Sequence, residues 1–493
     1  MRLTRLMTTI SAGADASGAL DGADLEIAGL TADSRLVRPG FLFAALPGSH
    51  NDGRAFIADA VAKGATAILA PPDTMCVPPG VRLIEDPAPR RAFALMAAAF
   101  YSRQPKTVVA VTGTNGKTST VQFVRQIWER LGKRGACLGT LGLSAPAGVD
   151  WAGPSMTTPD PVALHAGLAS LAEGGVDHLA MEASSHGLDQ FRLDGVRLKA
   201  AAFTNLTRDH LDYHGDMVTY LAAKGALFAR VLADDGIAVL NADAPEFPEL
   251  ALLCQIRGIR VLGYGFAGRE LKVVKVTPLA HGQRLTLLFL NQPVEIELGL
   301  IGRFQAWNAL CALGLVLAAD PQGAVGPVLE AVEALEGVPG RLQLVAHHPA
   351  GAPVIVDYAH TPDALETVLN ALRPHATGKL ALVFGCGGDR DRGKRPVMGE
   401  IAIRLADRVI VTDDNPRGEV PAAVRAESLA AAPGAVEIGD RRMAIKAAVG
   451  DLAAGDLLVI AGKGHEQGQI VGAETRPFDD AAEVRAAVAE ITK

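Results

Sequence analysis

The chain is poor in cysteine. It has five in 493 residues, Cys76, Cys137, Cys254, Cys311 and Cys386. They lie far apart, without the paired spacing of a zinc site or a disulfide framework. This excludes a disulfide-stapled scaffold and a cysteine-ligated zinc module, and we expect a reduced, cytoplasmic environment.

Long apolar runs are also missing. The most apolar stretch, residues 309–319, is about half as long as a bilayer-spanning helix, and it predicts a buried helix instead. Residues 1–10 carry two arginines but no sustained apolar core after them, so we expect no secretory signal. We therefore expect no membrane insertion.

Positive charge is in deficit, with 47 Lys and Arg against 54 Asp and Glu and a net charge of −7. This balance argues against a nucleic-acid partner but allows local basic pockets around a phosphorylated ligand. Hydrophobic residues make up 49% of the chain, which is ample for packed cores. At roughly 150 residues per domain, the length predicts about three domains.

The stretch VVAVTGTNGKTSTV at residues 108–121 lacks one glycine of the common phosphate-loop pattern, because Val111 stands where that glycine would be. A β-branched run at 108–111 predicts a buried strand, and one-sided apolar positions at 117–131 predict a helix. Such a junction points unpaired N–H groups and the positive end of the helix dipole at one spot. It is therefore suited to an anion.

The side chains of this loop fit a nucleotide phosphate. Gly113 and Gly116 allow the backbone to approach closely, Lys117 supplies a cation, and Thr118 supplies a hydroxyl for magnesium. The alternative is an ordinary strand–turn–helix with a surface lysine. The context favours the phosphate loop.

Strands and helices alternate along the chain and predict an α/β protein of three domains. Residues 1–105 predict a small α/β domain. Residues 106–338 predict a central domain with a mainly parallel sheet, to which the alternating segment 271–300 adds antiparallel strands. Residues 339–493 predict a doubly wound, Rossmann-like domain whose strands end in polar, glycine-containing loops, where ligands bind in such sheets.

Two polar segments follow neighbouring strands of the predicted central sheet. One contains Glu182, and the other contains His210 and His214. Because the ends of parallel strands meet at one edge, we expect Glu182 and His210 near the phosphate loop as magnesium ligands, although magnesium prefers oxygen. The histidine spacing leaves zinc as an alternative, but no His-Glu-x-x-His pattern is present, and a hydrogen-bonded loop histidine is the simpler interpretation.

Motifs along the whole chain resemble those of the Mur ligase family, the ATP-dependent amino acid ligases of peptidoglycan synthesis. The loop TGTNGKTS has the form found there and in the related folylpolyglutamate synthetases, where the leading glycine is not required. The other matching stretches are DSR (33–35), TTP (157–159), EASSHGL, NLTRDHLDYH, YLAAKGALF, GRFQAWNALCAL, VPGRLQ, DYAHTPDAL, GCGGDRDRGKRP, DDNPRGE and GKGHE.

The resemblance is nearest to family members that add meso-diaminopimelate to UDP-N-acetylmuramoyl-L-alanyl-D-glutamate. It implies ligation through an acyl phosphate with ATP and Mg²⁺, in a cytoplasmic monomer whose central domain is phosphate-loop ATPase-like. The implied catalytic residues are Lys117, Glu182, His210 and Lys224, with Thr118, Glu182, His210 and carbamylated Lys224 around the metal.

The resemblance also implies three sets of binding residues. The ATP set is Gly113, Thr114, Asn115, Gly116, Lys117, Thr118, Ser119, Asn308, Arg341, Asp357, Tyr358 and His360. The UDP-sugar set is Ser34, Ser49, His50, Asn51, Thr157, Thr158, Ser184, Gln190 and Arg192. The amino-acid set is Arg390, Asp414, Asn415, Pro416, Arg417, Gly462 and Glu466.

Some residues also have plainer interpretations. Lys224 lies in a predicted amphipathic helix, where a lysine is ordinarily solvated, and Asn-Pro-Arg at 415–417 is typical of a charged surface turn. The small polar residues of the UDP-sugar set are common at turns and helix caps. In each case the family motif favours the functional interpretation.

Four rival functions are compatible with a phosphate loop or a Rossmann-like fold. The DSR and DNPR motifs argue against a folylpolyglutamate synthetase, and DNPR argues against the ligase that adds D-alanyl-D-alanine. A phosphate-loop switch or motor would not need the polar clusters of the third domain. A dinucleotide oxidoreductase would need the Gly-x-Gly-x-x-Gly fingerprint, which GTLGLS and GCGGDRDRG lack.

Overall fold

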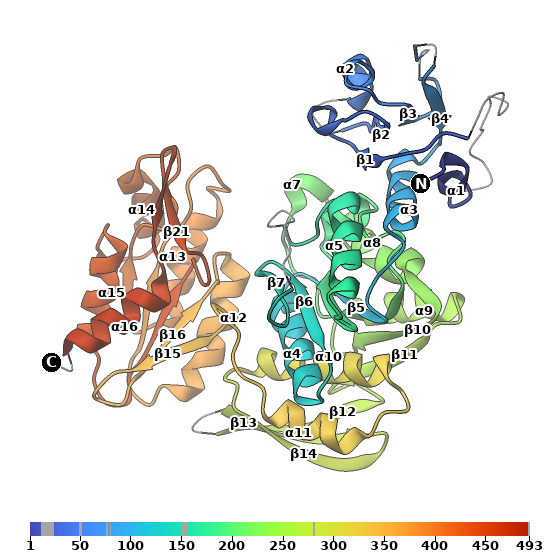
Figure 1. The fold of residues 1–493 in the computed structure, drawn as a ribbon. Helices are drawn as coiled ribbons and strands as arrows, with labels where there is room; N and C mark the ends of the chain where they lie inside the picture. The colour runs from blue at the N-terminus through green and yellow to red at the C-terminus, as the bar shows by residue number, and fades with distance from the viewer. Residues whose placement is uncertain are drawn as a thin grey trace.

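The computed structural model describes residues 1–10, 24–48, 52–74, 77–78, 80–149, 156–279 and 282–491. These residues form three lobes, each built on its own main β-sheet (Figure 1). Within the described ranges, no helix has both the length and the apolar character needed to cross a membrane.

The N-terminal lobe is a four-stranded parallel sheet in the order β1-β2-β3-β4. Helices α1 and α3 pack on one face of this sheet, and α2 packs on the other. The elements are β1 (Gly29–Thr31), β2 (Phe41–Ala44), β3 (Ala67–Ala70), β4 (Arg82–Glu85), α1 (Leu3–Met7), α2 (Ile57–Ala62) and α3 (Pro89–Tyr101).

The central lobe holds a ten-stranded sheet in the order β14-β13-β12-β11-β10-β9-β5-β8-β6-β7. The strands from β6 to β12 pair in parallel, whereas β12-β13-β14 and β6-β7 are antiparallel. The strands are β5 (Thr107–Thr112), β6 (Gly135–Gly139), β7 (Gly142–Ser144), β8 (His178–Glu182), β9 (Leu198–Phe203), β10 (Leu232–Asn241), β11 (Arg260–Gly265), β12 (Leu271–Leu279), β13 (Gly282–Phe289) and β14 (Gln292–Leu298).

Helices cover both faces of the central sheet. One face carries α4 (Lys117–Arg130), α10 (Arg303–Ala319) and α11 (Val325–Glu333). The other carries α5 (Pro161–Glu173), η3 (Leu227–Val231) and α9 (Phe247–Ile256). Short helices α6 (Ser185–Asp189) and α7 (Leu211–His214) precede α8 (Met217–Ala226), which runs into η3.

The C-terminal lobe is a six-stranded sheet in the order β15-β16-β20-β17-β18-β19, in which only the β15-β16 pairing is antiparallel. Helices α12, α13 and α14 pack on one face, and α15 and α16 pack on the other. The elements are β15 (Gln343–His347), β16 (Pro353–Asp357), β17 (Leu380–Phe384), β18 (Arg408–Val411), β19 (Val436–Glu437), β20 (Leu457–Ala461), α12 (Pro362–Leu372), α13 (Lys394–Leu405), α14 (Pro421–Leu429), α15 (Arg441–Gly450) and α16 (Asp480–Ile491), with a separate hairpin of β21 (Gly468–Val471) and β22 (Glu474–Pro477).

The sequence predicted these main elements correctly. The strand expected at 108–111 is β5, the helix expected at 117–131 is α4, and the segment 271–300 forms the antiparallel strands β12, β13 and β14. Residues 309–319 lie inside α10, and most of them are buried. The β21-β22 hairpin was not predicted.

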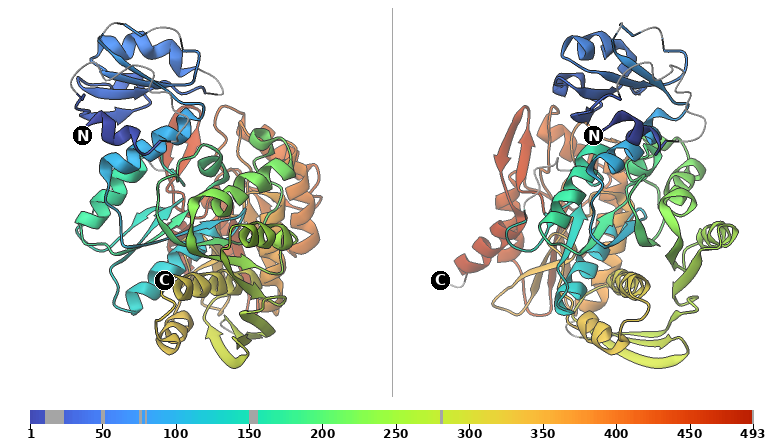
Figure 2. Two further views of the ribbon diagram at one scale, coloured as in Figure 1. Left: turned by 90° about the vertical axis from the view of Figure 1, so that its right-hand side faces the viewer. Right: turned by 45° about the vertical axis from the view of Figure 1, so that its right-hand side comes forward.

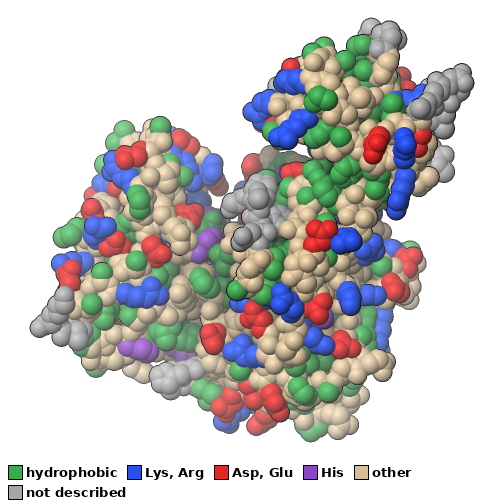
Figure 3. All heavy atoms as spheres, viewed as in Figure 1, with side chains coloured by type: hydrophobic (Ala, Val, Ile, Leu, Met, Phe, Trp, Pro, Cys, Tyr) green, Lys and Arg blue, Asp and Glu red, His purple; other side chains and the backbone are tan. Residues whose placement is uncertain are grey.

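The central lobe carries the other two lobes on different sides (Figure 1). The N-terminal lobe stands on α3 above the central lobe, and the C-terminal lobe lies beside the central lobe (Figures 1 and 2). Figure 3 shows the surface hollowed between the C-terminal and central lobes. Arg91 of α3 pairs with the buried carboxylate of Asp194 at 3.1 Å, and this pair fastens the N-terminal lobe to the central lobe.

A buried ion pair joins the last two helices. Arg441, at the start of α15, donates two hydrogen bonds of 2.7 Å to Asp480, at the start of α16, and both side chains are fully buried. Arg441 also donates to the carbonyl of Ala461 at the end of β20, at 3.0 Å. The pair therefore braces the end of β20, where the loop of residues 462–466 begins.

Substitution Asp480→Ala is expected to destabilise the C-terminal lobe by about 3–5 kcal/mol, because it leaves the Arg441 charge buried without its partner. Hydrogen exchange of α15 and α16 measures the change. The control Lys446→Ala breaks the exposed pair with Glu490 and should cost at most about 1 kcal/mol. Equal protection of the α15 and α16 amides in the two variants would show that the Arg441–Asp480 pair does not stabilise this lobe.

Candidate active site

The phosphate loop connects β5 to α4, as the sequence predicted. Gly113 and Gly116 have φ angles of 143° and 89°, in the region that favours glycine. A Cβ atom on Gly113 would lie 1.9 Å from Thr204 Oγ1, and one on Gly116 would lie 2.3 Å from Asn308 Oδ1. Both positions therefore require glycine, for conformation and for space.

Lys117 folds back over this loop. Its Nζ donates to the carbonyls of Gly113 and Thr114 at 2.9 Å each. Burial lowers the pKa of Lys117. The negative charge of Glu182 raises that pKa and so opposes part of the shift. Thr118, also buried, accepts a long hydrogen bond of 3.4 Å from Arg341 Nη2 of the linker to the C-terminal lobe.

Lys224 reaches the same loop from α8. Its side chain is buried, with 1% of the residue exposed, so the solvated-lysine alternative is wrong. Its Nζ donates to the Gly113 carbonyl at 2.8 Å and lies 4.2 Å from the centre of the Tyr220 ring. Burial, and then the nearby charge of Lys117, lower the pKa of Lys224 well below its ordinary value. The environment therefore favours a neutral amine.

Glu182 ends β8, the strand next to β5, and is 1% exposed. Its two oxygens accept hydrogen bonds from the backbone N–H of Thr140 at 2.8 Å and from the Thr140 hydroxyl at 3.1 Å. These bonds fix the carboxylate at the end of the sheet where the phosphate loop begins.

His210 lies at the start of α7 with about half of its side chain exposed, 3.5 Å from Asp209. Its ring is 5.0 Å from the ring of His186. The His214 ring lies 5.4 Å from the same His186 ring, and its Nε2 is 3.0 Å from the Ser185 hydroxyl. Over the ranges that the structure describes, no three His, Cys, Asp or Glu side chains are grouped as a metal site.

Most of the UDP-sugar set forms one network beside Glu182. Thr158 Oγ1 donates to the Glu182 carbonyl at 3.1 Å and accepts from the Ser184 hydroxyl at 3.0 Å. Arg192 donates to the carbonyl of Thr158 at 2.8 Å and to Gln190 Oε1 at 2.7 Å.

Two parts of the UDP-sugar set lie apart from this network or outside the described chain. Ser34 is buried in the N-terminal lobe, where its carbonyl accepts from Lys63 at 3.1 Å, and it makes no described contact with the network. Ser49, His50 and Asn51 lie outside the described residues. Thr157 does join the network, through a hydroxyl contact of 3.1 Å with Thr140.

The remaining ATP residues lie where the central and C-terminal lobes meet. The guanidinium of Arg341 lies 4.8 Å from the centre of the Tyr358 ring, and the Tyr358 ring lies 4.5 Å from that of His360. Asp357 is buried and accepts from the backbone of Leu342 at 2.7 Å. Burial raises the pKa of Asp357.

Gln305 is a residue of this region that the sequence reasoning missed. Its Nε2 donates to the Arg341 carbonyl at 3.1 Å, and its Oε1 accepts from Asn308 Nδ2 at 3.0 Å. It therefore links α10 to the first residues of the C-terminal lobe. The motif GRFQAWNALCAL contained it, but a glutamine in an apolar helix carries no distinctive signal.

The amino-acid set forms a second cluster, at the ends of β18 and β20. Asp414 and Asn415 are buried, and Asn415 Nδ2 donates to Glu466 Oε2 at 2.9 Å. Gly462, with a φ of 116°, lets the chain turn beside Asp414. A buried lysine, Lys463, lies among these side chains and was not singled out from the sequence.

Arg417 presents its guanidinium at the edge of this cluster. It has a φ of 50°, its backbone N–H donates to Ile470 of the hairpin at 3.0 Å, and its Nη1 donates to the Gly388 carbonyl at 2.9 Å. Arg390 is exposed and donates only a long 3.3 Å bond to the Asp389 carbonyl in the same loop. Both arginines border Gly387.

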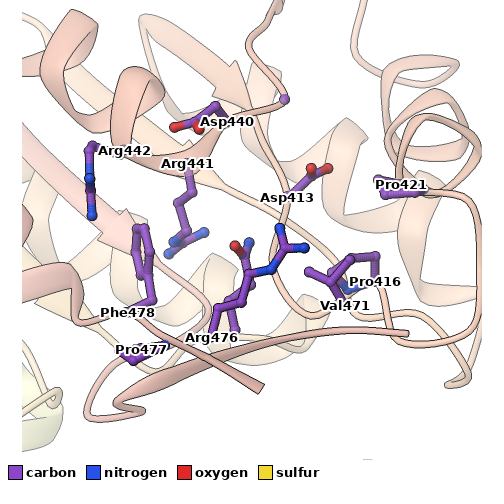
Figure 4. A pocket seen from close by; sticks show the side chains of 12 residues that line it. Asp413, Pro416, Pro421, Asp440, Arg441, Arg442, Val471, Arg476, Pro477 and Phe478 are labelled. Atoms are coloured by element: carbon purple, nitrogen blue, oxygen red, sulfur yellow. The ribbon is translucent and has the colours of Figure 1, made fainter. Parts of the chain in front are cut away.

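A separate cavity of about 450 Å³ adjoins the same loop. Figure 4 shows Arg441 and Arg476 pointing into it, with Pro416 and Val471 on one side. Of the amino-acid set, only Pro416 lines it. This cavity is therefore distinct from the cluster around Asp414, Asn415 and Glu466.

Comparison with known proteins identifies the family. Three family models match in chain order: "Mur ligase family, catalytic domain" at residues 26–101, "Mur ligase middle domain" at 111–316 and "Mur ligase, glutamate ligase domain" at 340–464.

Similar proteins match over nearly the whole chain. The UDP-N-acetylmuramoyl-L-alanyl-D-glutamate–2,6-diaminopimelate ligases of Caulobacter vibrioides and Mesorhizobium japonicum are 55% and 53% identical, over 93% and 95% of this chain and 95% and 96% of theirs. A solved structure of a ligase of that name has a TM-score of 0.71 at 33% identity, over 95% of this chain and 96% of its own. The chain therefore belongs to the Mur ligase family, the ATP-dependent amino acid ligases of peptidoglycan synthesis.

Proposed function

We propose that this Mur ligase joins meso-2,6-diaminopimelate to UDP-N-acetylmuramoyl-L-alanyl-D-glutamate, with hydrolysis of ATP to ADP and phosphate. The observation that carries the proposal is the second cluster, in which Arg417 and the carboxylates of Asp414 and Glu466 lie together at one sheet edge. The names of the relatives at 53–55% identity support the same reaction.

The reaction has two steps. The free carboxylate of the D-glutamyl residue attacks the terminal phosphate of ATP, the bond from that phosphate to ADP breaks, and an acyl phosphate and free ADP are formed. The substrate amine then attacks the acyl carbon, and the tetrahedral intermediate expels phosphate as the amide forms. Negative charge accumulates in both steps, so the protein's task is to hold phosphates and to balance their charge.

The phosphate loop and its neighbours bind ATP in this proposal. The N–H groups at the start of α4 and the ammonium of Lys117 hold the terminal phosphates, once Lys117 exchanges its carbonyl contacts for phosphate oxygens. Asn308 and Arg341 contact the nucleotide, with Asp357, Tyr358 and His360 behind Arg341. Gly113, Thr114, Asn115, Gly116 and Ser119 complete the loop.

The residues present fit a magnesium ion. Thr118 and Glu182 offer the oxygen ligands that Mg²⁺ prefers. The buried amine of Lys224 points at the loop, and the His210 ring lies 6.3 Å from the ring of Tyr220, which Lys224 contacts. When bound, Mg²⁺ supplies positive charge to the phosphates. As an ammonium, Lys224 would oppose a cation, whereas its carbamate would supply an oxygen.

The surroundings of Lys224 support its carbamylation. Carbon dioxide adds only to a neutral amine. Burial lowers the pKa of Lys224 and so favours its neutral form. The new N–C bond replaces an N–H bond, and the released proton leaves a carbamate anion. The hydrogen bond to Gly113 holds the amine beside the loop while this happens.

The two other substrates lie on either side of the phosphate loop in this proposal. The network of Thr157, Thr158, Ser184, Gln190 and Arg192 binds the muramoyl-dipeptide arm, with Ser34, Ser49, His50 and Asn51 toward the uridine. Arg417 and Arg390 grip the distal carboxylate of diaminopimelate, because a guanidinium pairs with a carboxylate through two parallel hydrogen bonds. Asp414, Gly462 and Glu466 face its distal amine, Asn415 donates to its carboxylate, and Pro416 stiffens the loop.

The separate main sheets and the linkers between them support a division into three domains. We place the UDP-sugar domain at residues 1–105, the ATP domain at 106–338 and the amino-acid domain at 339–493. Arg341 of the third domain contacts Thr118 of the second, so we propose that domain closure completes the site and keeps water from the acyl phosphate. We further propose that the enzyme acts as a cytoplasmic monomer.

Release of ADP from the purified protein should require both UDP-muramoyl-dipeptide and meso-diaminopimelate. L-Lysine should be poorer by about 100-fold or more in kcat/KM, because it leaves Arg417 unpaired. Arg417→Ala should raise the KM for diaminopimelate sharply and change the KM for ATP little. Equal use of lysine and diaminopimelate would contradict the assignment of the substrate while sparing the ligase reaction.

Lys224→Ala should be nearly inactive although folded, because the ligand to magnesium is lost. Acetate or formate should partly restore ligation by placing an oxygen in the vacated position. The initial rate of ligation, with and without the acid, measures this. The control Lys199→Ala removes an exposed lysine of β9 and should keep wild-type activity. Full activity of Lys224→Ala would refute a catalytic carbamate.

A further inference from the structure

Lys463 is a buried cation inside the cluster that we assign to the amino-acid substrate. It follows Gly462 in the loop after β20 and is 0% exposed. We propose that Lys463 is a positioning residue: it holds Asp414, Asn415 and Glu466 in the arrangement that recognises a ligand end carrying both an ammonium and a carboxylate. This inference rests on the proposed function and adds a residue to it.

The three donors of Lys463 are matched by three acceptors. Its Nζ lies 3.0 Å from Asn415 Oδ1, 3.1 Å from Glu466 Oε2 and 3.5 Å from Asp414 Oδ1. An ammonium has three N–H groups and no acceptor. With these groups engaged and no surface exposed, Lys463 does not touch the substrate, and any effect on it must pass through its three partners.

The first consequence concerns the orientation of the Asn415 amide. Its Oδ1 accepts from both Lys463 Nζ and the backbone N–H of Ile470, at 3.0 and 2.9 Å. The flipped amide would place its own donors against these two donors. Lys463 and the hairpin therefore fix Nδ2 on the side of Glu466, where it donates at 2.9 Å. Its second N–H remains for a carboxylate of the ligand.

The second consequence concerns charge. Asp414 and Glu466 are both carboxylates within reach of one amine, and without that amine the two negative charges would repel each other. Lys463, Asp414 and Glu466 together carry one net negative charge, and Arg417 beside them carries one positive charge. This balance complements a zwitterionic amino acid end, whose ammonium and carboxylate also cancel.

The neighbouring arginines cannot take over the contacts of Lys463 with the two carboxylates. Arg441 is committed to Asp480 by two hydrogen bonds of 2.7 Å and to the Ala461 carbonyl. Arg417 donates a hydrogen bond to the Gly388 carbonyl and lies at the outer edge of the cluster. Among the described residues, Lys463 is the one cation that forms ion pairs with both Asp414 and Glu466.

The test compares Lys463→Met with Lys446→Met, which removes an exposed lysine of the same domain. Lys463→Met should raise the KM for meso-diaminopimelate by about 30-fold or more, because a buried hydrogen-bonded charge is removed. The KM values for ATP and UDP-muramoyl-dipeptide should change less than about threefold. Preference for diaminopimelate over L-lysine should fall about tenfold. Lys446→Met should match the wild type.

A double variant makes the test independent of folding. Lys463→Met together with Glu466→Gln removes both charges of one contact, so no carboxylate is left unpaired by that contact. Multiplying the KM increases of the two single variants gives the KM expected for independent effects. The KM of the double variant for diaminopimelate should lie at least about tenfold below that value. If Lys463→Met does not fold, the double variant compared with Glu466→Gln alone should show less than a threefold further rise.

Two results would overturn the inference. One is a diaminopimelate KM within twofold of the wild type in Lys463→Met. The other is a parallel rise in all three KM values, which would mark a purely structural lysine. Failure of the wild-type protein to ligate diaminopimelate is a different result, because it would overturn the proposed function first.

Discussion

The hydrogen bond from Lys224 to the Gly113 carbonyl is the contact on which the candidate active site depends. It joins α8 to the phosphate loop across the end of the central sheet. Lys117 donates to the same carbonyl, so two lysines converge on one acceptor. Such a pair of ammonium groups is unfavourable, and the pKa of each is lowered from its ordinary value, first by burial. A catalytic carbamate at Lys224 would turn this repulsion into attraction.

The order of the strands brings the other groups to this point. β5 lies between β8 and β9, so the phosphate loop, Glu182 and the segment after β9 share one sheet edge. Thr204 after β9 occupies the space beside Gly113, and Asn308 of α10 occupies the space beside Gly116. The loop is thus packed on both sides by residues far apart in sequence, which gives it one shape.

The sequence predicted the parts of this arrangement that repeat locally. The strand–helix alternation, the antiparallel segment at 271–300 and the glycine-containing strand–loop–helix junction at 108–121 all have a distinct period or composition, and the structure contains each of them. Residues whose roles depend on the packing of distant segments were harder to find. Gln305 and Lys463 are ordinary residue types, and only folding surrounds them with the carbonyl and carboxylate groups that they bridge.

Lys224 is another residue whose surroundings local sequence patterns did not predict. Helical spacing alone favoured a solvated lysine, whereas the family motif favoured a functional, carbamylated one. The structure leaves 1% of the residue exposed, so the solvated lysine is wrong. The short β21-β22 hairpin escaped prediction because four-residue strands with mixed polar and apolar residues carry little periodic signal. Yet this hairpin supplies the Ile470 contacts to Asn415 and Arg417.

Carbon-13 NMR of the enzyme in ¹³C-bicarbonate tests the central claim most directly, because it observes the carbamate itself and not the rate that depends on it. The account predicts a carbamate signal in the wild-type protein that is absent from Lys224→Met and present in Lys199→Met, whose lysine is exposed. Full ligation activity of wild-type enzyme in buffer freed of carbon dioxide, where no carbamate signal is seen, would contradict the account.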